Sequence, residues 1–322
     1  MQNMRLGANR ISVLQAFGYA TYLHHRFGPR KISTAEESAI SKEDWNWAGS
    51  SVKRCFSLRP DLTTLLKCLI QGGIEKMLQE CTLRPGLPVQ PMLGQISRGI
   101  GHAVKQFNGA FLAEFKYDGM RAQIHMTQDE MKVFSRKNED KTGQMPDVVR
   151  IAREKLASSV ESAVMDTECV AIDRSTGRFK SFQELSTRSR SDVDESEINV
   201  AIAIYVFDMM YLNGESLVDR PLAERRSFAK ASLHHAANEM QLAESEEISE
   251  DTPQEECEDK VTSLLHSSLS QQGEGLMLKK LNQPGALYEP GRRSESWMKA
   301  RITIWNVSLS GTAFVTSSLF SF

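Results

Sequence analysis

The hydrophobic pattern divides the chain into a helical first part and a strand-rich second part. Residues 8–25 place apolar side chains on or near one face of a helix, and residues 61–81 do the same. The Gly72-Gly73 pair predicts a break or kink in the second of these helices. Residues 31–57 have a less regular pattern, so we expect a looser connection there.

A proline-rich stretch marks the boundary between the two parts. Pro85, Pro88 and Pro91 fall within seven residues, and this spacing predicts an extended linker. We therefore expect a helical domain over residues 1–82 and a second domain from residue 83.

Beyond the linker, most apolar runs are short and bounded by turn residues, which is typical of strands. The expected strands are residues 111–116, 120–125, 131–135, 163–172, 199–212 and 273–280. Helices are expected from Pro146 to about residue 158, over 220–237 and over 257–271. Asn213-Gly214 predicts a tight turn after the strand over 199–212.

Composition and charge describe an ordinary soluble globular protein of about two domains. Of the 322 residues, 40% are hydrophobic and 25% charged, and no apolar run approaches a membrane span. Residues 1–110 hold 14 basic and 7 acidic side chains, a net of +7, which suits a polyanionic partner. Residues 238–260 hold ten acids and one lysine, and this run predicts a solvated loop.

Two features of the sequence bear on the compartment. The five cysteines form no C-x-x-C pair, which favours reduced thiols in a reducing compartment. The first acid is Glu36, and the basic segment before it imitates a mitochondrial transit peptide, although a basic amphipathic helix is favoured.

The chemistry centres on the stretch from Lys116 to Arg121, which reads as strand, tight turn and strand. An amine in a partly enclosed site beside other cations becomes a nucleophile, and arginine holds phosphate well. Taken alone, the stretch is better interpreted as a charged hairpin with a solvated lysine. Asp166 and Glu168 lie two apart on an otherwise apolar strand, so they need a cation, a metal or ligand hydroxyls. A structural salt bridge is an equal alternative for them.

Phosphate binding in this chain requires basic side chains. The sequence has neither G-x-x-x-x-G-K-[ST] nor G-x-G-x-x-G. A lysine nucleophile, cations for phosphate oxygens and carboxylates for a metal suit a displacement at phosphorus.

Six motifs, in order along the chain, resemble those of ATP-dependent DNA ligases of the eukaryotic type, within the covalent nucleotidyltransferases. The matching segments are 116–121, 134–140, 166–171, 206–208, 274–279 and 297–301. The resemblance implies an α+β fold. An antiparallel-sheet adenylation domain over 83–301 would follow a partial all-α DNA-binding domain over 1–82.

The resemblance also implies a role for each matching residue. Lys116 would attack the α-phosphate of ATP to form lysyl-AMP, with Glu114 beside the adenine and Phe207 stacked on it. The other implied ligands are Arg121 and Glu168 for the ribose and sugar-phosphate region, Glu168 and Glu274 for Mg²⁺, Arg136 for nucleotide or nick phosphate, and Lys279, Lys299 and Arg301 for phosphate charge.

The implied partner is nicked duplex DNA, joined during replication, repair and recombination, and the implied location is the nucleus, with organellar import left open. Arg5 and Gly7 match a segment that contacts the DNA backbone, and such contacts ignore base sequence.

Two departures from the family pattern bear on activity. Arg301 stands where the family usually has lysine, and residues 302–322 form a divergent apolar, serine-rich tail where the OB-fold domain is expected. We therefore expect a fragment with impaired sealing. Two alternatives remain: a catalytically inactive fragment that only binds DNA, and an RNA ligase or capping-type nucleotidyltransferase.

Overall fold

The computed structural model describes residues 9–107, 110–189, 191–282 and 285–300. The predictions for Arg5, Gly7, Arg301 and the tail over 302–322 lie outside these residues. Within the described part, no helix is both long enough and apolar enough to cross a bilayer.

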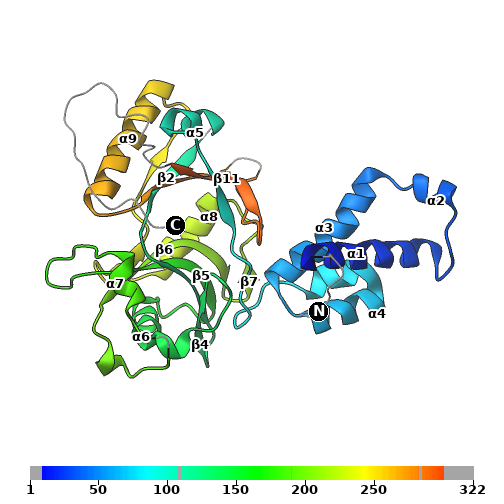
Figure 1. Ribbon diagram of the computed structural model, residues 1–322, viewed down its shortest axis with the longest axis horizontal. Coiled ribbons are helices and arrows are strands. Elements are labelled where there is room, and N and C mark those ends of the chain that lie inside the picture. The colour runs from blue at the N-terminus through cyan, green and yellow to red at the C-terminus, as the bar shows by residue number, and fades with distance from the viewer. Residues whose placement is uncertain (1–8, 108–109, 190, 283–284, 301–322) are drawn as a thin grey trace.

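The first part of the chain forms a helical lobe, which we define as residues 10–80 (Figure 1). Its helices are α1 Arg10–Phe27, α2 Thr34–Ser38, α3 Lys42–Leu58 and α4 Leu62–Glu80. Leu14, Val52 and Leu65 belong to a core shared by α1, α3 and α4. The predicted kink in α4 is present, because Gly73 has a φ of +73° that few other residues adopt.

Helix α3 occupies a segment for which the sequence predicted a loose connection, so that prediction was wrong. The Ser41 side chain caps the helix by accepting a hydrogen bond from the Asp44 amide. The helix packs closely on α1, where a Cβ added to Gly18 would lie 2.2 Å from the Ala48 carbonyl oxygen. Such close contact needs small residues, and they dilute the apolar periodicity by which the helix would be recognised.

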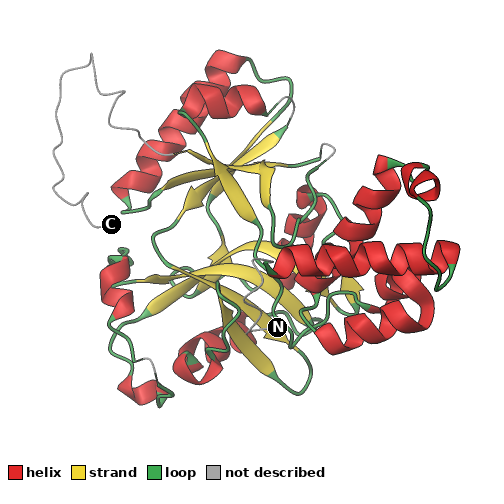
Figure 2. Ribbon diagram, turned by 45° about the vertical axis from the view of Figure 1, so that its right-hand side comes forward, coloured by secondary structure: helices red, strands yellow, loops and turns green. Residues whose placement is uncertain are grey.

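The second part folds into two sheets, which Figure 2 shows one above the other. Sheet A has the order β1-β11-β10-β2-β9 and sheet B the order β4-β3-β5-β6-β7, with β8 paired to β6. Most pairs are antiparallel, as predicted; β1–β11 and β6–β8 are parallel. The strands of sheet A are β1 Leu93–Ile96, β2 Phe111–Lys116, β9 Ser245–Ile248, β10 Gly275–Lys280 and β11 Arg293–Ala300. Those of sheet B are β3 Met120–Met126, β4 Met131–Ser135, β5 Ala163–Ala171, β6 Ile202–Leu212, β7 Glu215–Ser216 and β8 Met240–Leu242.

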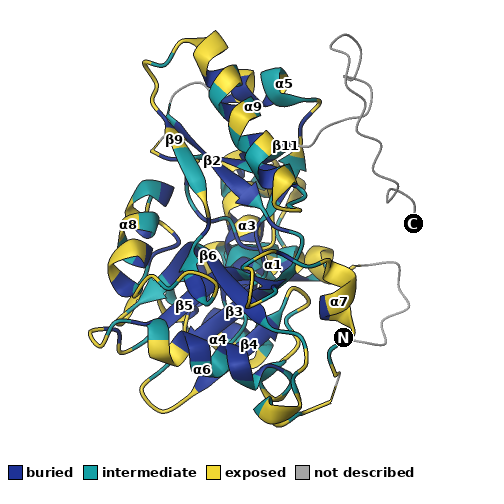
Figure 3. Cartoon of the chain, turned by 90° about the vertical axis from the view of Figure 1, so that its left-hand side faces the viewer, coloured by how far each residue is buried: buried dark blue, intermediate teal, exposed yellow. Residues whose placement is uncertain are grey.

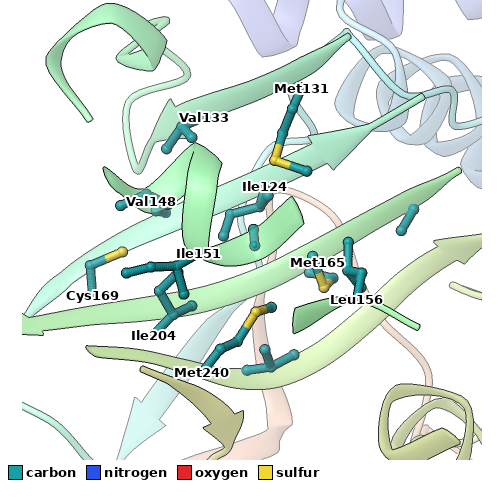
Figure 4. Close-up of a cluster of buried hydrophobic side chains, with 14 of the residues drawn as sticks. Ile124, Met131, Val133, Val148, Ile151, Leu156, Met165, Cys169, Ile204 and Met240 are labelled. Atoms are coloured by element: carbon teal, nitrogen blue, oxygen red, sulfur yellow. The ribbon is translucent and has the colours of Figure 1, made fainter. Parts of the chain in front are cut away.

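Helices pack against both sheets, which makes an α+β fold. The helices of this part are α5 Ile100–Gln106, α6 Pro146–Lys155, α7 Phe182–Ser186, α8 Leu222–Ser232 and α9 Gln254–Ser270, with short 3₁₀ turns at Thr142–Gln144 and Glu195–Glu197. Val148 and Ile151 of α6 pack on Ile124, Met165 and Ile204 of sheet B (Figure 4). The strands are accordingly buried over most of their length (Figure 3).

The sequence predicted a solvated loop over the acidic run 238–260, and this prediction was wrong for much of the run. It contains β8 and β9 and the start of α9. Strand β9 lies at the edge of sheet A, paired with β2, where Ile248 is buried and Glu247 is exposed. An edge strand accepts charged side chains on its solvent face, so acidity alone does not exclude a strand.

Candidate functional site

A pocket of about 640 Å³ lies between the two sheets and holds all the predicted site residues that the structure describes. These are Glu114, Lys116, Arg121, Arg136, Glu168, Phe207, Glu274, Lys279 and Lys299. They come from separate segments of the chain, so the fold brings together residues of all six motifs. The turn between β2 and β3 passes from sheet A to sheet B along the pocket wall.

Strand register explains which side chains of sheet A reach the pocket. Met277 of β10 lies opposite Glu114 of β2 and opposite Lys299 of β11. Residues two apart on a strand share a face, so Lys116 and Lys279 lie on the same face as this row. All five of these side chains line the pocket.

Lys116 is the last residue of β2, and its side chain is 19% exposed. Its Nζ forms an ion pair with Glu274, whose amide donates to the Lys116 carbonyl at 2.7 Å. In the turn that follows, a Cβ on Gly119 would lie 2.5 Å from the Cys169 carbonyl oxygen, so a side chain does not fit there. The nucleophile candidate is thus held at a tight junction of the two sheets.

Arg121 is held by a buried network. Its Nε and Nη2 donate to the two carboxylate oxygens of Asp166 at 2.9 and 2.6 Å, and its Nη1 donates to the Met92 carbonyl at 2.8 Å. The Tyr288 hydroxyl donates to Asp166 at 2.7 Å. For Asp166, therefore, the salt-bridge alternative is the one observed. Tyr288 was missed by the sequence analysis, because no local signal links it to a strand 122 residues away.

Phe207 reaches the pocket through an irregularity in β6. The register with β5 runs from Asp166↔Asp208 to Thr167↔Val206, which leaves Phe207 without a partner residue. A phenylalanine on an apolar strand is usually buried in the core, but Phe207 is half-buried and lines the pocket. Its ring centroid lies 5.4 Å from the Arg121 guanidinium carbon and 4.7 Å from the Lys279 Nζ.

Glu114 and Lys279 form a buried ion pair at the pocket floor. The Lys279 Nζ lies 2.5 Å from one Glu114 oxygen, and Arg226 of α8 donates to the other oxygen at 3.0 Å. Burial raises the pKa of Glu114 and lowers that of Lys279, and the opposite charges of the pair counteract both effects. Arg226 was not among the predicted residues; its position on a helix gave no indication of this contact.

The carboxylates near Lys116 suit a divalent cation. Burial raises the pKa of Glu168 to about 8, although Lys116 and Arg121 favour its charge, and the charges of Asp166 and Glu274 raise it further. Within the described residues, no group of three or more His, Cys, Asp or Glu side chains could hold a metal. A cation bound between Glu168 and Glu274 would reduce the repulsion between their carboxylates. Because such a cation can take its other ligands from a nucleotide and from water, these two residues fit Mg²⁺.

Further basic side chains line the pocket. Arg136 and Lys137 are exposed in the turn after β4, and Lys141 and Lys299 line the same pocket. The sequence analysis named Arg136 and Lys299 but not Lys137 or Lys141. Such a cluster suits the negative charge of phosphates.

Comparisons with known proteins identify relatives. Residues 91–301 match the family described as "ATP dependent DNA ligase domain". The chain is 33% identical over 307 residues to DNA ligase 3 of Schizosaccharomyces pombe, covering 94% of this chain and 38% of that protein. It is 34% identical over 309 residues to DNA ligase 1 of Dictyostelium discoideum, covering 92% of this chain and 25% of that protein.

Among solved structures, the ligase domain of LigD from M. tuberculosis aligns with a TM-score of 0.48 and 21% identity, covering 66% of this chain and 59% of that one. The chain spans between 22% and 42% of the length of the curated relatives that it matches.

Proposed function

We propose, from the premise that this chain belongs to the ATP-dependent DNA ligase domain family, that it transfers AMP from ATP to its own Lys116 and then to a nick in duplex DNA. The observation that carries the proposal is a pocket that contains Lys116 together with other cationic side chains and two carboxylates, Glu168 and Glu274. A lysine in that setting suits in-line displacement at phosphorus.

In the first step, the Lys116 Nζ attacks the α-phosphorus of ATP, a phosphorus–nitrogen bond forms, and pyrophosphate leaves. The amine must first lose a proton, and the Glu274 carboxylate, which is paired with Nζ, is suited to accept it. Arginine at position 116 would keep the charge but not the nucleophile, because guanidinium stays protonated.

Different residues of the pocket are assigned to different parts of the nucleotide. We assign the adenine to Phe207 and the neighbourhood of Glu114, and the ribose and sugar-phosphate region to Arg121 and Glu168. The phosphate charge is assigned to Arg136, Lys279 and Lys299, together with Arg301 beyond the described residues. Bound Mg²⁺, held by Glu168 and Glu274, would neutralise phosphate charge.

The proposed substrate is a nick with a 5′-phosphate. The phosphate takes AMP from Lys116, and the 3′-hydroxyl then attacks it, which joins the strands and releases AMP. The helical lobe and the preceding Arg5 and Gly7 would contact the duplex backbone, independently of base sequence. Roles in replication, repair and recombination, and a nuclear location, are part of this proposal.

The deciding experiment is mass spectrometry of residues 1–322 after incubation with ATP or GTP and Mg²⁺. The proposal expects an AMP adduct on Lys116 with ATP. An adduct with GTP instead would support a capping-type enzyme, and retention of nicked DNA without an adduct would support a fragment that only binds DNA.

The metal assignment has a separate test. Glu168→Gln and Glu274→Gln each replace a carboxyl group, which can bind a cation as carboxylate, by an amide of the same size, so adduct formation should fall and recover partly with more Mg²⁺ or with Mn²⁺. Unchanged dependence on metal concentration in both variants would make these acids structural.

A further inference from the structure

The linker between the helical lobe and the sheets is contacted by three side chains of one strand. Residues 83–92 contain no helix or strand. On strand β3, Arg121, Gln123 and His125 lie two residues apart and so share one face. Each of them hydrogen bonds to a different point of the linker backbone. We call these three side chains the linker clamp.

Gln123 is the centre of the linker clamp. Its Nε2 donates to the Val89 carbonyl at 2.6 Å, and its Oε1 accepts from the Val89 amide at 3.0 Å. The Gln123 side chain thus satisfies both backbone groups of one residue, as a neighbouring strand would. Val89 is fully buried and Gln123 is 2% exposed, so water does not replace these bonds easily.

His125 forms the second contact, and its tautomer follows from its partners. The Gly86 amide donates to Nδ1 at 3.1 Å, so Nδ1 carries no proton. The proton of the neutral ring is then on Nε2, which lies 3.3 Å from Oε1 of Gln123 and donates to it. Burial lowers the pKa of His125 to about 3, which keeps the ring neutral.

The third contact connects the linker to the pocket. Arg121 donates to the Met92 carbonyl at 2.8 Å, and the Met92 amide donates to the Tyr288 hydroxyl at 3.2 Å. Arg121 and Tyr288 are also the two partners of Asp166 beside the pocket. The end of the linker is therefore held by the same network that holds a pocket side chain.

The linker is also fixed to the helical lobe. The Gln90 amide donates to the Ser57 carbonyl at 2.8 Å, near the end of α3. Leu58, the last residue of α3, shares an apolar cluster with Val89, Met92 and Trp297. Through these contacts α3 and the linker are packed against each other and against sheet B.

We propose that Gln123 and His125 are positioning residues that fix the helical lobe relative to the nucleotide pocket, so that duplex DNA bound to the lobe is held in front of Lys116. The consequence for DNA rests on the proposed function; the fixed orientation does not. A free proline-rich linker is a semi-rigid spacer that does not fix the orientation of the two parts it connects. The linker clamp fixes this orientation before DNA binds.

The test uses two variants and a matched control on the full chain. Gln123→Met keeps the side-chain volume and removes the contacts with Val89, and His125→Phe keeps the ring and removes the contact with Gly86. Gln241→Met, on β8, makes the same chemical change away from the linker. Spin labels on Ile70→Cys in the helical lobe and Glu161→Cys beside sheet B report the distance between the two parts, because both positions are exposed and all five native thiols are buried.

The expected result is a narrow label–label distance distribution in the parent and in Gln241→Met, and a broad one in Gln123→Met. Affinity for nicked duplex DNA should fall about tenfold in Gln123→Met, because two hydrogen bonds to the linker backbone are lost. It should fall less in His125→Phe, which loses one such hydrogen bond. Formation of the AMP adduct on Lys116 without DNA should be unchanged in both.

An unchanged distance distribution in both clamp variants would overturn the proposal. Adduct formation that falls in parallel with DNA affinity would do the same, because the residues would then be merely structural. If Gln123→Met does not fold, His125→Phe decides, since it removes a single contact with the linker backbone. If the parent forms no adduct, the proposed function fails, while the label distances still decide the role of the linker clamp.

Discussion

The helical lobe and the sheets bury different kinds of side chain. Among the described residues of the lobe, the core is apolar and no ion pair is fully buried; the Arg26 and Asp44 side chains, for example, are 44% and 43% exposed. Between the sheets, Arg225 and Asp208 form an ion pair with no exposure at all.

Burial of charge is costly, and a buried ion pair often adds no net stability compared with an apolar pair of the same shape. The sheets nevertheless bury several, including Glu114 with Lys279 beside the pocket. The difference indicates that the lobe is organised mainly for packing, whereas the two-sheet part also holds charged groups in fixed positions, some of them at the pocket.

The largest effect is expected at Lys116. Lys116→Arg should abolish the AMP adduct, because guanidinium does not become a nucleophile, while DNA binding and the melting temperature stay near those of the parent. Intact-mass spectrometry measures the adduct, and Lys105→Arg, on the exposed end of α5, is the matched control. An adduct on the Lys116→Arg protein would refute the assignment of the nucleophile.

Removal of one partner from a buried pair should cost far more stability than removal of one from a surface pair. Arg225→Met leaves Asp208 buried without its cation and should lower the free energy of unfolding by about 3–5 kcal/mol. Arg26→Met should cost at most about 1 kcal/mol. Denaturant titration measures both, and Arg225→Met combined with Asp208→Leu should recover much of the loss. Equal effects at the two sites would remove the contrast between the two regions.

The pocket should also make stability depend on pH. Because the pKa of Glu168 is raised to about 8, the folded protein favours its protonated form. The stabilisation is full below the unfolded pKa of about 4.3 and is lost as pH rises towards 8. Glu168→Gln lacks this term, so its melting temperature relative to the parent should increase between pH 5 and pH 9. A constant difference across that range would mean that Glu168 is charged in the folded state throughout.

The smallest effect is expected where the two regions meet at the surface. Arg54 of the helical lobe pairs with Asp219, but their side chains are 40% and 66% exposed. Arg54→Met should change stability by less than about 1 kcal/mol, and that change should vanish at high salt. If Arg54→Met changed the orientation of the lobe more than Gln123→Met does, the surface pair, and not the linker clamp, would fix that orientation.

Local rules were enough for much of the fold. Glycine with a positive φ explains the kink at Gly73, proline at a first helical position explains the start of α6 at Pro146, and Asn213-Gly214 forms the expected turn. The stretch around Lys116 was equally readable, because its strands, its tight turn and its chemistry all lie within a few residues.

Contacts between distant residues were decided only by the tertiary structure. Helix α3 is stabilised by close packing on α1, and β9 by its pairing with β2, neither of which leaves a local pattern. The same holds in the pocket for Arg226 and Tyr288, whose partners lie more than a hundred residues away. The sequence by itself therefore determined which residues are candidates for the chemistry, since nucleophile, cations and acids are properties of residue type. The tertiary structure decided which of those charges pair with each other and which face the pocket, because ion pairing depends on distances that only the folded chain sets.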